Sequence, residues 1–142
     1  MIRKKTKSQN TQMIDALNTA IACDDMNTMH ELLSNNIDIN STGSNGFYPA
    51  MVAIEYGNVN ALIALIKRGA NVNVVYKQTG YSILMRALSL KYIPNRYMIV
   101  ATLLKNGADV NILSHDSKTA LYIARTKRPA YINILKRYGG QY

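Results

Sequence analysis

The sequence has few of the residues that build covalent or metal-bound frameworks. Its 142 residues contain one cysteine, Cys23, and two histidines, His30 and His115. A single cysteine excludes both an intramolecular disulfide and a zinc site made of cysteines. The two histidines are 85 residues apart, so we interpret them as surface or loop residues rather than metal ligands. The sequence therefore predicts a chain that binds no metal and no cofactor.

Long apolar runs are also missing. No stretch reaches the roughly 18 apolar residues that a membrane span requires, although 48% of the chain is hydrophobic. The basic residues 3–7 are not followed by the apolar segment of a secretory signal. The length fits one domain. We therefore expect a soluble protein with no membrane partner, in the cytoplasm of the producing cell or of a host cell.

Acidic residues are scarce and unevenly placed. The chain has 17 Lys and Arg against 8 Asp and Glu, a net charge of +9. Residues 8–71 carry six acids and two basic residues, whereas residues 72–142 carry eleven basic residues and two acids. This asymmetry indicates an electrostatic field that steers partners of opposite charge and is screened by salt.

The common catalytic motifs are absent. There is no glycine-rich phosphate loop, no His-Glu-x-x-His pair and no Gly-x-Ser-x-Gly elbow. We interpret Cys23 as a small buried hydrophobic residue. The acids Asp24 and Asp25 are interpreted as the end of one helix and the cap of the next. The sequence therefore predicts no catalytic residues and a protein that is not an enzyme.

Self-similarity is the strongest signal present. Three short segments resemble one another: 37–40, 69–73 and 107–111, each ending in Asn. These asparagines, Asn40, Asn73 and Asn111, are 33 and 38 residues apart. We expect their side chains to bond to the backbone of their own loops. Each segment follows an apolar run at helical spacing, which in turn follows a shorter predicted helix.

The predicted helices have recognisable starts and ends. The first helix of each pair is predicted at residues 16–23, 49–56, 83–91 and 120–127. Pro49 suits a first helical position, and the hydroxyls of Ser82 and Thr119 can cap helix N-termini. Gly69, Gly107 and Gly139 suit the left-handed turn after a helix, and Asn36 is expected to take that role in the first repeat.

A pattern of about 33 residues, made of two helices and a loop, resembles the ankyrin repeat. Residues 48–53, Tyr-Pro-Ala-Met-Val-Ala, stand where that family has Thr-Pro-Leu-His-x-Ala. Residues 82–87 and 119–124 are further copies, and residues 18–20 begin a looser first copy. The chain departs from the family at the histidine position, which is occupied by Met51, Met85 and Tyr122.

The resemblance implies an all-α ankyrin-repeat solenoid of four stacked helix–turn–helix units with finger loops. We predict a basic N-terminal tail at residues 1–10 and a repeat domain at 11–142. Its repeats are predicted at about 11–44, 45–78, 79–115 and 116–142. The third repeat has about four extra residues near 92–97, because Ala87 and Gly107 are 20 residues apart where Ala53 and Gly69 are 16 apart.

The resemblance also implies a function, namely binding a partner protein through the concave face and the loop tips. Val52, Leu90, Ile123 and Thr126 are expected to lie exposed on that face, beside the predicted contact residues. The predicted contact residues are Phe47, Glu55, Tyr56, Tyr76, Lys77, Tyr81, Arg86, Ser89, Lys118 and Arg125. We expect a monomer that acts as an adaptor or inhibitor, such as a viral or bacterial host-directed protein or a toxin antidote.

The basic C-terminal half leaves a second function open. Arg125, Lys127 and Arg128 precede Lys136 and Arg137, with tyrosines between them. Basic patches with interleaved aromatic residues can bind nucleic acid. An exposed terminal repeat must also be polar, and lysine and arginine serve that need. We interpret the N-terminal residues 3–7 as a solvated tail rather than a phosphate-binding arm.

Overall fold

The computed structural model describes residues 3–142, which form helices joined by loops. No β-strand occurs in this range, and Val75 and Ser82 form one isolated antiparallel bridge. The predicted all-α class is therefore confirmed. The helices are α1 (Lys7–Ala22), α2 (Met26–Ser34), α3 (Pro49–Glu55), α4 (Val59–Lys67), α5 (Ile83–Ser89), α6 (Arg96–Lys105), α7 (Ala120–Lys127), the 3-10 helix η1 (Pro129–Tyr131) and α8 (Ile132–Arg137).

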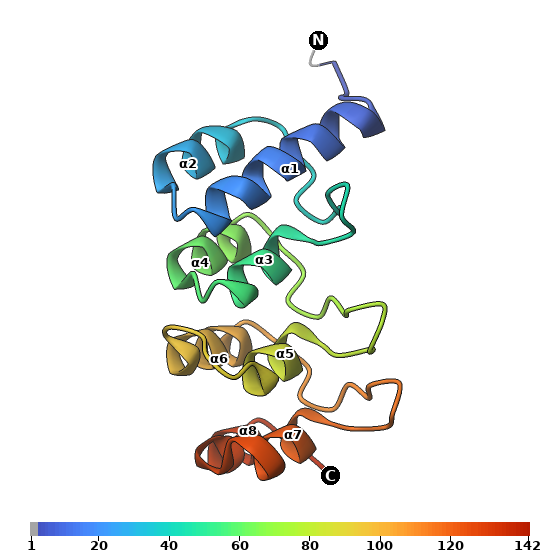
Figure 1. The fold of residues 1–142 in the computed structure, drawn as a ribbon, viewed down its shortest axis with the longest axis vertical. Coiled ribbons are helices and arrows are strands. Elements are labelled where there is room, and N and C mark those ends of the chain that lie inside the picture. Colours follow the sequence, from blue (N-terminus) through green and yellow to red (C-terminus); the bar gives the residue numbers. More distant parts are fainter. Residues whose placement is uncertain (1–2) are drawn as a thin grey trace. The chain divides into compact units, whose positions relative to one another are not determined.

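The chain divides into two compact units. Unit 1 extends to Asn71, and unit 2 comprises residues 72–142. Unit 1 contains the helix pairs α1–α2 and α3–α4, and unit 2 contains α5–α6 and α7–α8 with η1 (Figure 1). Each unit therefore consists of two of the four predicted helix–turn–helix motifs.

Unit 1 is built on α1, which packs against both α2 and α3. Ile14 and Leu17 of α1 are fully buried, as are Met29 of α2 and Leu62 of α4. Ala53 of α3 is also inaccessible to solvent. A small residue at this position lets neighbouring helices approach closely, as the repeat pattern predicts, and the long apolar side chains then fill the space between them.

Unit 2 repeats this arrangement with α5 and α7 side by side. The alanines Ala87 of α5 and Ala124 of α7 are fully buried. Leu103 of α6 and Leu135 of α8 are also fully buried. Because neither helix pair can cover its own apolar stripe, the pairs are stable only when they are packed together within the unit.

The helix starts follow from the capping residues. Ser82 and Thr119 accept hydrogen bonds from the amides of Met85 and Tyr122, as predicted. Helix α1 begins much earlier than predicted, because Thr6 and Gln9 form a capping box. The Thr6 hydroxyl accepts from the Gln9 amide, and the Gln9 side chain accepts from the Thr6 amide. Four residues of the predicted tail, 7–10, are therefore helical.

The left-handed glycine turns after the second helices agree with prediction, whereas α5 ends at Ser89 and not at the predicted residue 91. Gly69 and Gly107 have φ angles of 86° and 88°, the left-handed conformation that an L side chain disfavours. The prediction for Asn36 was wrong, because no positive φ occurs there. Instead the chain leaves α2 in an extended conformation at Asn35, with φ −82° and ψ 157°.

Asparagine side chains form hydrogen bonds between consecutive repeats. The prediction placed these bonds within single loops. The Asn40 amide donates to the Gly69 carbonyl at 3.0 Å and accepts from the Asn71 amide at 2.8 Å. Asn73 makes the same pair of bonds with Gly107 and Asp109. Asn111 makes them with Gly139 and Gln141. We call each such pair an asparagine stitch.

A related pair of bonds lies within the first repeat. Asn10 lies on α1, accepts from the Asp38 amide at 2.9 Å and donates to the Asp38 carbonyl at 3.3 Å. It therefore holds the start of α1 against the segment that follows α2.

The loops between helix pairs project as fingers in unit 2. The finger at residues 75–82 is closed by a bond from the Tyr76 amide to the Tyr81 carbonyl at 2.9 Å. The His115 amide of the next finger donates to the Thr79 carbonyl at 2.9 Å. Figure 1 shows both fingers of unit 2 on the same side of its helices. A backbone hydrogen bond therefore connects the two fingers to each other.

Candidate functional site

Unit 2 carries a series of cations that lie over tyrosine rings. The Arg86 guanidinium is 5.7 Å from the centre of the Tyr76 ring. Lys118 lies 5.6 Å from the ring of Tyr122. We call the residues of these pairs, together with Arg125 and Tyr142, the cation–tyrosine surface. Such contacts hold a flexible cation in place through the ring quadrupole.

The third contact of this surface joins α7 to the C-terminal segment. The Arg125 guanidinium lies 5.3 Å from the centre of the Tyr142 ring, and Lys136 of α8 lies 5.8 Å from the same centre. The Thr119 hydroxyl donates to the Gln141 carbonyl at 2.9 Å, which holds this segment beside the start of α7. Arg125, Lys136 and Tyr142 are all exposed. They are therefore accessible to a partner.

Lys118 is held by an ion pair in addition to its contact with the Tyr122 ring. Its ammonium is 2.5 Å from a carboxylate oxygen of Asp116. The hydrogen bond and charge of Asp116 raise the pKa of Lys118, with smaller contributions from Tyr81 and Tyr122. Bonds from Lys118 and from the Ser114 hydroxyl lower the pKa of Asp116. Lys118 and Asp116 therefore both remain charged through the neutral pH range. Both residues lie in the finger that precedes α7.

The predicted contact residues of unit 2 differ in exposure. Lys77 and Arg125 are exposed, and Tyr81, Arg86, Ser89 and Lys118 are half-buried. Tyr76 is only 8% exposed, so its ring supports Arg86 more than it faces solvent. The structure thus brings Tyr76 and Arg86 together, and places Tyr81 near Lys118.

The three predicted residues of unit 1 lie on or beside α3. Tyr56 caps the end of α3 and is 56% exposed. Phe47 and Glu55 are half-buried. The Phe47 carbonyl accepts from the Asn18 amide at 3.3 Å, so this residue also fixes the loop to α1.

Three expectations about single side chains were wrong. Val52 and Ile123 are buried, at 8% and 2% exposure, although both were expected to be exposed on the concave face. Helix α7 instead turns Tyr122 and Arg125 outward. Cys23 is exposed and not buried, because it caps α1 beyond the last buried turn.

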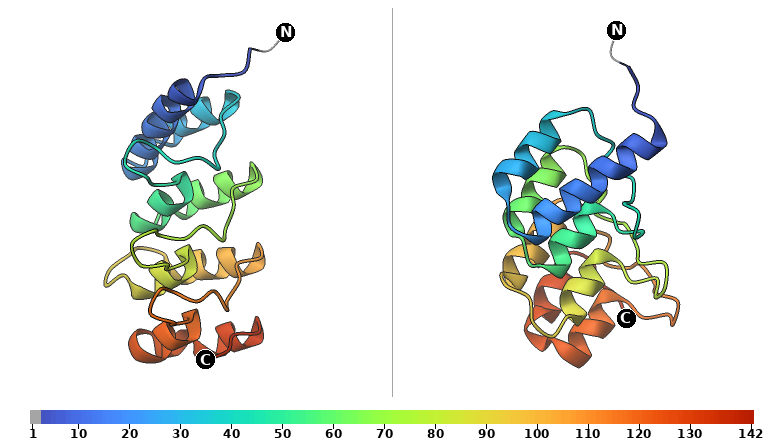
Figure 2. Two further views of the ribbon diagram at one scale, coloured as in Figure 1. Left: turned by 90° about the vertical axis from the view of Figure 1, so that its right-hand side faces the viewer. Right: turned by 45° about the horizontal axis from the view of Figure 1, so that its top comes forward.

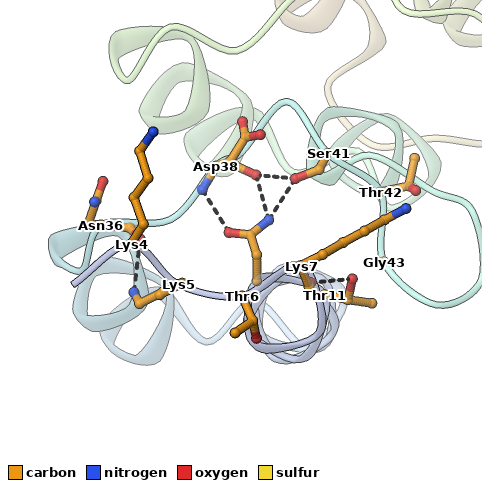
Figure 3. A pocket seen from close by; sticks show the side chains of 11 residues that line it. Lys4, Lys5, Thr6, Lys7, Thr11, Asn36, Asp38, Ser41, Thr42 and Gly43 are labelled. Carbon is orange, nitrogen blue, oxygen red and sulfur yellow. Dashed lines mark hydrogen bonds between the residues drawn. The ribbon is translucent and has the colours of Figure 1, made fainter.

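Unit 1 contains a polar cleft of about 710 Å³ beside the start of α1. Figure 3 shows Lys4, Lys5 and Lys7 around it, with Asp38 and Ser41 on the opposite wall. The Lys5 ammonium donates to the Asn36 carbonyl at 2.9 Å. Residues 5–7 are therefore ordered against unit 1, while the side chains of Thr6 and Lys7 remain exposed to solvent.

Comparison with known proteins gives the family. A family model of ankyrin repeats, in three copies, matches residues 17–114. The chain belongs to the ankyrin-repeat family. The matched range ends before α7. The evidence for a fourth ankyrin repeat is therefore structural, namely the helix pair α7–α8 and the stitch from Asn111.

Two relatives with ankyrin repeats share one name and similar levels of identity. The chain is 30% identical over 138 residues to the ankyrin repeat, SAM and basic leucine zipper domain-containing protein 1 of Dasypus novemcinctus, covering 96% of the chain and 28% of the relative. The protein of the same name from Echinops telfairi is 30% identical over 115 residues, covering 80% and 24%. The chain thus spans about a quarter of the length of these relatives.

The third ankyrin repeat carries its extra residues between α5 and α6. Tyr92 in this loop is 82% exposed, and Tyr97 at the start of α6 is 63% exposed. Tyr97 lies 6.5 Å from Tyr131 of η1, measured between ring centres. The contact predictions omitted these tyrosines. The altered spacing of the repeat located the insertion, but no sequence signal indicated that η1 approaches it.

Membrane spans and metal clusters are both missing from residues 3–142. No helix there has both the length and the apolar character to span a membrane. No three His, Cys, Asp or Glu residues in that range are grouped as metal ligands would be.

Proposed function

We propose that this chain is a protein-binding module that presents the cation–tyrosine surface of unit 2 to its partner. Ankyrin repeats in general mediate protein–protein interaction, and ankyrin-repeat proteins are typically non-catalytic. The single observation that carries the finer proposal is the placement of Arg86, Lys118 and Arg125 over tyrosine rings.

The energetic argument rests on pre-organisation. A free arginine or lysine loses rotamer freedom when it is fixed at an interface. Here Lys118 is already held by Asp116 and Tyr122, and Arg125 by Tyr142. Tyrosine and arginine are also the residues that most often dominate interface energies. A partner with a complementary acidic patch therefore gains attraction and steering at a reduced entropic cost.

We infer the role of an adaptor or inhibitor, since a rigid surface can bridge two proteins or cover an active one. A cytoplasmic, monomeric protein fits this role, in the producing cell or in a host. The remaining predicted contacts, Phe47, Glu55, Tyr56, Lys77, Tyr81 and Ser89, are proposed as neighbouring parts of the interface.

The test is capture of a partner from native lysate, with and without nuclease, at two salt concentrations. The triple variant Lys118→Ala/Tyr122→Ala/Arg125→Ala removes two of the cations of the surface and the exposed ring of Tyr122. Lys105→Ala is the matched control, because Lys105 is an exposed cation of unit 2 in the last turn of α6, outside the cation–tyrosine surface. We expect the wild type and the control to recover the same protein, and the triple variant to lose it by at least tenfold.

A different result would identify the second function. The basic residues of α7 and α8 favour phosphate contacts, as Lys136 and Arg137 are exposed. Nucleic acid recovered by all three proteins, and lost with nuclease or salt, would contradict the proposed protein surface.

A further inference from the structure

A second exposed surface of unit 2 lies at the opposite end of α5 from the fingers. Helix α5 begins after the finger at residues 75–82 and ends at the inserted loop, residues 90–95. Figure 2 shows this loop in yellow, protruding beside α5 and α6. We call Lys91, Tyr92, Arg96, Tyr97, Met98, Arg128 and Tyr131 the insertion platform.

Two arginines fix the inserted loop from different elements. Arg96 of α6 donates from Nε to the Ala87 carbonyl at 3.0 Å, and from Nη2 to the carbonyls of Leu90 and Lys91. Arg128, which follows α7, donates from Nη2 to the same carbonyls of Leu90 and Lys91, at 2.8 and 3.0 Å. The end of α5 is therefore capped by two cations, where a helix carries its negative dipole end.

The two guanidiniums share these carbonyls without a balancing carboxylate. Within the described residues, the hydrogen-bond partners of Arg96 and Arg128 are all backbone carbonyls. Burial and the charge of Arg128 lower the pKa of Arg96. The Nε donor of Arg128 is buried and has no hydrogen-bond partner within residues 3–142. The site is therefore positively charged and incompletely compensated.

The surrounding sequence adds no negative charge. Residues 83–98 and 127–131 contain Arg86, Lys91, Arg96, Lys127 and Arg128 but no acid. The two acids of unit 2, Asp109 and Asp116, lie in the segments after α6 and before α7, at the finger end. A negatively charged partner thus meets no repulsion from unit 2 at the insertion platform.

Exposed apolar area accompanies this charge. Tyr92 and Tyr97 are 82% and 63% exposed, and Met98 is 52% exposed. The rings of Tyr97 and Tyr131 are 6.5 Å apart and inclined at 42°. Arginine, tyrosine and methionine are the residue types enriched at protein interfaces. Large exposed side chains of this kind, grouped on the fixed loop and the adjoining start of α6, indicate a docking surface.

We propose that the insertion platform is a second docking site, separate from the cation–tyrosine surface, that binds an acidic segment of another protein. The acidic groups of that segment complement Arg96, Arg128 and Lys91, and its apolar side chains pack on Tyr92, Tyr97 and Met98. Protein is favoured over nucleic acid because the exposed thioether side chain of Met98 can pack on an apolar side chain of a peptide. The apolar Met98 adds nothing to phosphate binding.

The test is selection of a random peptide display library on the full chain, followed by affinity measurements with the selected peptides. The variant Tyr92→Ser/Tyr97→Ser removes only exposed side chains, so it is expected to keep the thermal unfolding curve of the wild type. Arg125→Ala is the matched control at the cation–tyrosine surface. We expect acidic peptides with aromatic or aliphatic residues, at least tenfold weaker on the double variant and unchanged on the control.

Three outcomes would overturn the proposal. Enrichment without acidic residues would contradict the charge argument. Acidic peptides weakened by Arg125→Ala and not by the double variant would contradict this second site while supporting the proposed function. A 20-residue oligothymidine that binds wild type and loses at least tenfold with Tyr92→Ser/Tyr97→Ser, while no acidic peptide is selected, would replace the protein segment by single-stranded nucleic acid.

Discussion

At the scale of single residues, the asparagine stitch decides how one repeat is held to the next. Each of Asn40, Asn73 and Asn111 uses its amide group both as donor and as acceptor, about thirty residues along the chain. The residue type was readable from the repeat motif. The hydrogen-bond partners of these asparagines could not be predicted from the motif. A short polar side chain can bond to the backbone of its own loop or to that of the next repeat, and only the packing of the repeats decides between them.

We predict that Asn111→Ala lowers the free energy of unfolding by about 1–2 kcal/mol, since two hydrogen bonds are lost. These are the bonds to Gly139 and Gln141. Chemical denaturation monitored by circular dichroism measures the change.

Asn111→Asp is the control for this prediction. Its carboxylate still accepts from the Gln141 amide but cannot donate to Gly139. We expect an intermediate loss of stability. Alanine and aspartate variants that are both as stable as the wild type would show that the stitch carries no net energy.

Caps at single residues were the most predictable feature. Ser82 and Thr119 were assigned correctly, and α7 has its predicted bounds of 120–127. The start of α1 was missed, although Thr6 and Gln9 have the capping-box spacing in the sequence. The apolar run that locates a helix begins later here, so the polar first turn gave no periodic signal.

At the scale of elements, the two fingers of unit 2 depend on close approach at one glycine. Gly80 has φ +70°, and a Cβ there would lie 2.5 Å from Cδ2 of His115 and 2.8 Å from its amide nitrogen. Gly46 has φ +82° with nothing within 4 Å of that position. A substitution at Gly46 therefore tests backbone strain alone, whereas a substitution at Gly80 tests strain together with steric crowding.

We predict that Gly46→Ala costs about 1 kcal/mol of unfolding free energy through strain at positive φ. Gly80→Ala is expected to cost about 2–3 kcal/mol, because the methyl group also displaces His115. Thermal or urea unfolding of both variants gives the difference. Equal costs at the two positions would contradict the proposed contact between fingers.

The inserted loop shows where element-scale prediction stops. Repeat spacing indicated about four extra residues near 92–97, and Pro94-Asn95 indicated the break before α6. Asn95 indeed has a left-handed φ of 56°. That Arg128 would reach Leu90, 38 residues earlier, could not be read from spacing, because it requires α5 and α7 to lie side by side.

At the scale of the whole molecule, the sequence gives the charge distribution directly and predicts the architecture in part. Residues 72–142 carry eleven basic residues against two acids, whatever the fold. One repeat domain was predicted at 11–142, and the structure divides into two units after Asn71. The stitches from Asn40 and Asn73 lie on either side of that division, each inside its own unit.

We predict that raising NaCl from about 20 mM to about 300 mM increases the melting temperature by about 3 °C, because screening relieves the repulsion among like charges. The gain should be concentrated in unit 2. Hydrogen exchange provides an internal control, since amides of α5 to α8 should gain more protection than those of α1 to α4. Equal gains in both units would contradict an electrostatic origin.

The stitches have a consequence for how such a chain can lengthen and diverge. Each asparagine pairs with main-chain groups of the following repeat; the carbonyl partner is a glycine each time, whereas the bond to the amide partner places no demand on the side chain there. The amide partners are Asn71, Asp109 and Gln141, three different residues that serve equally. A duplicated repeat would therefore be joined at this point without compensating substitutions, and its surface would be free to acquire a new binding specificity.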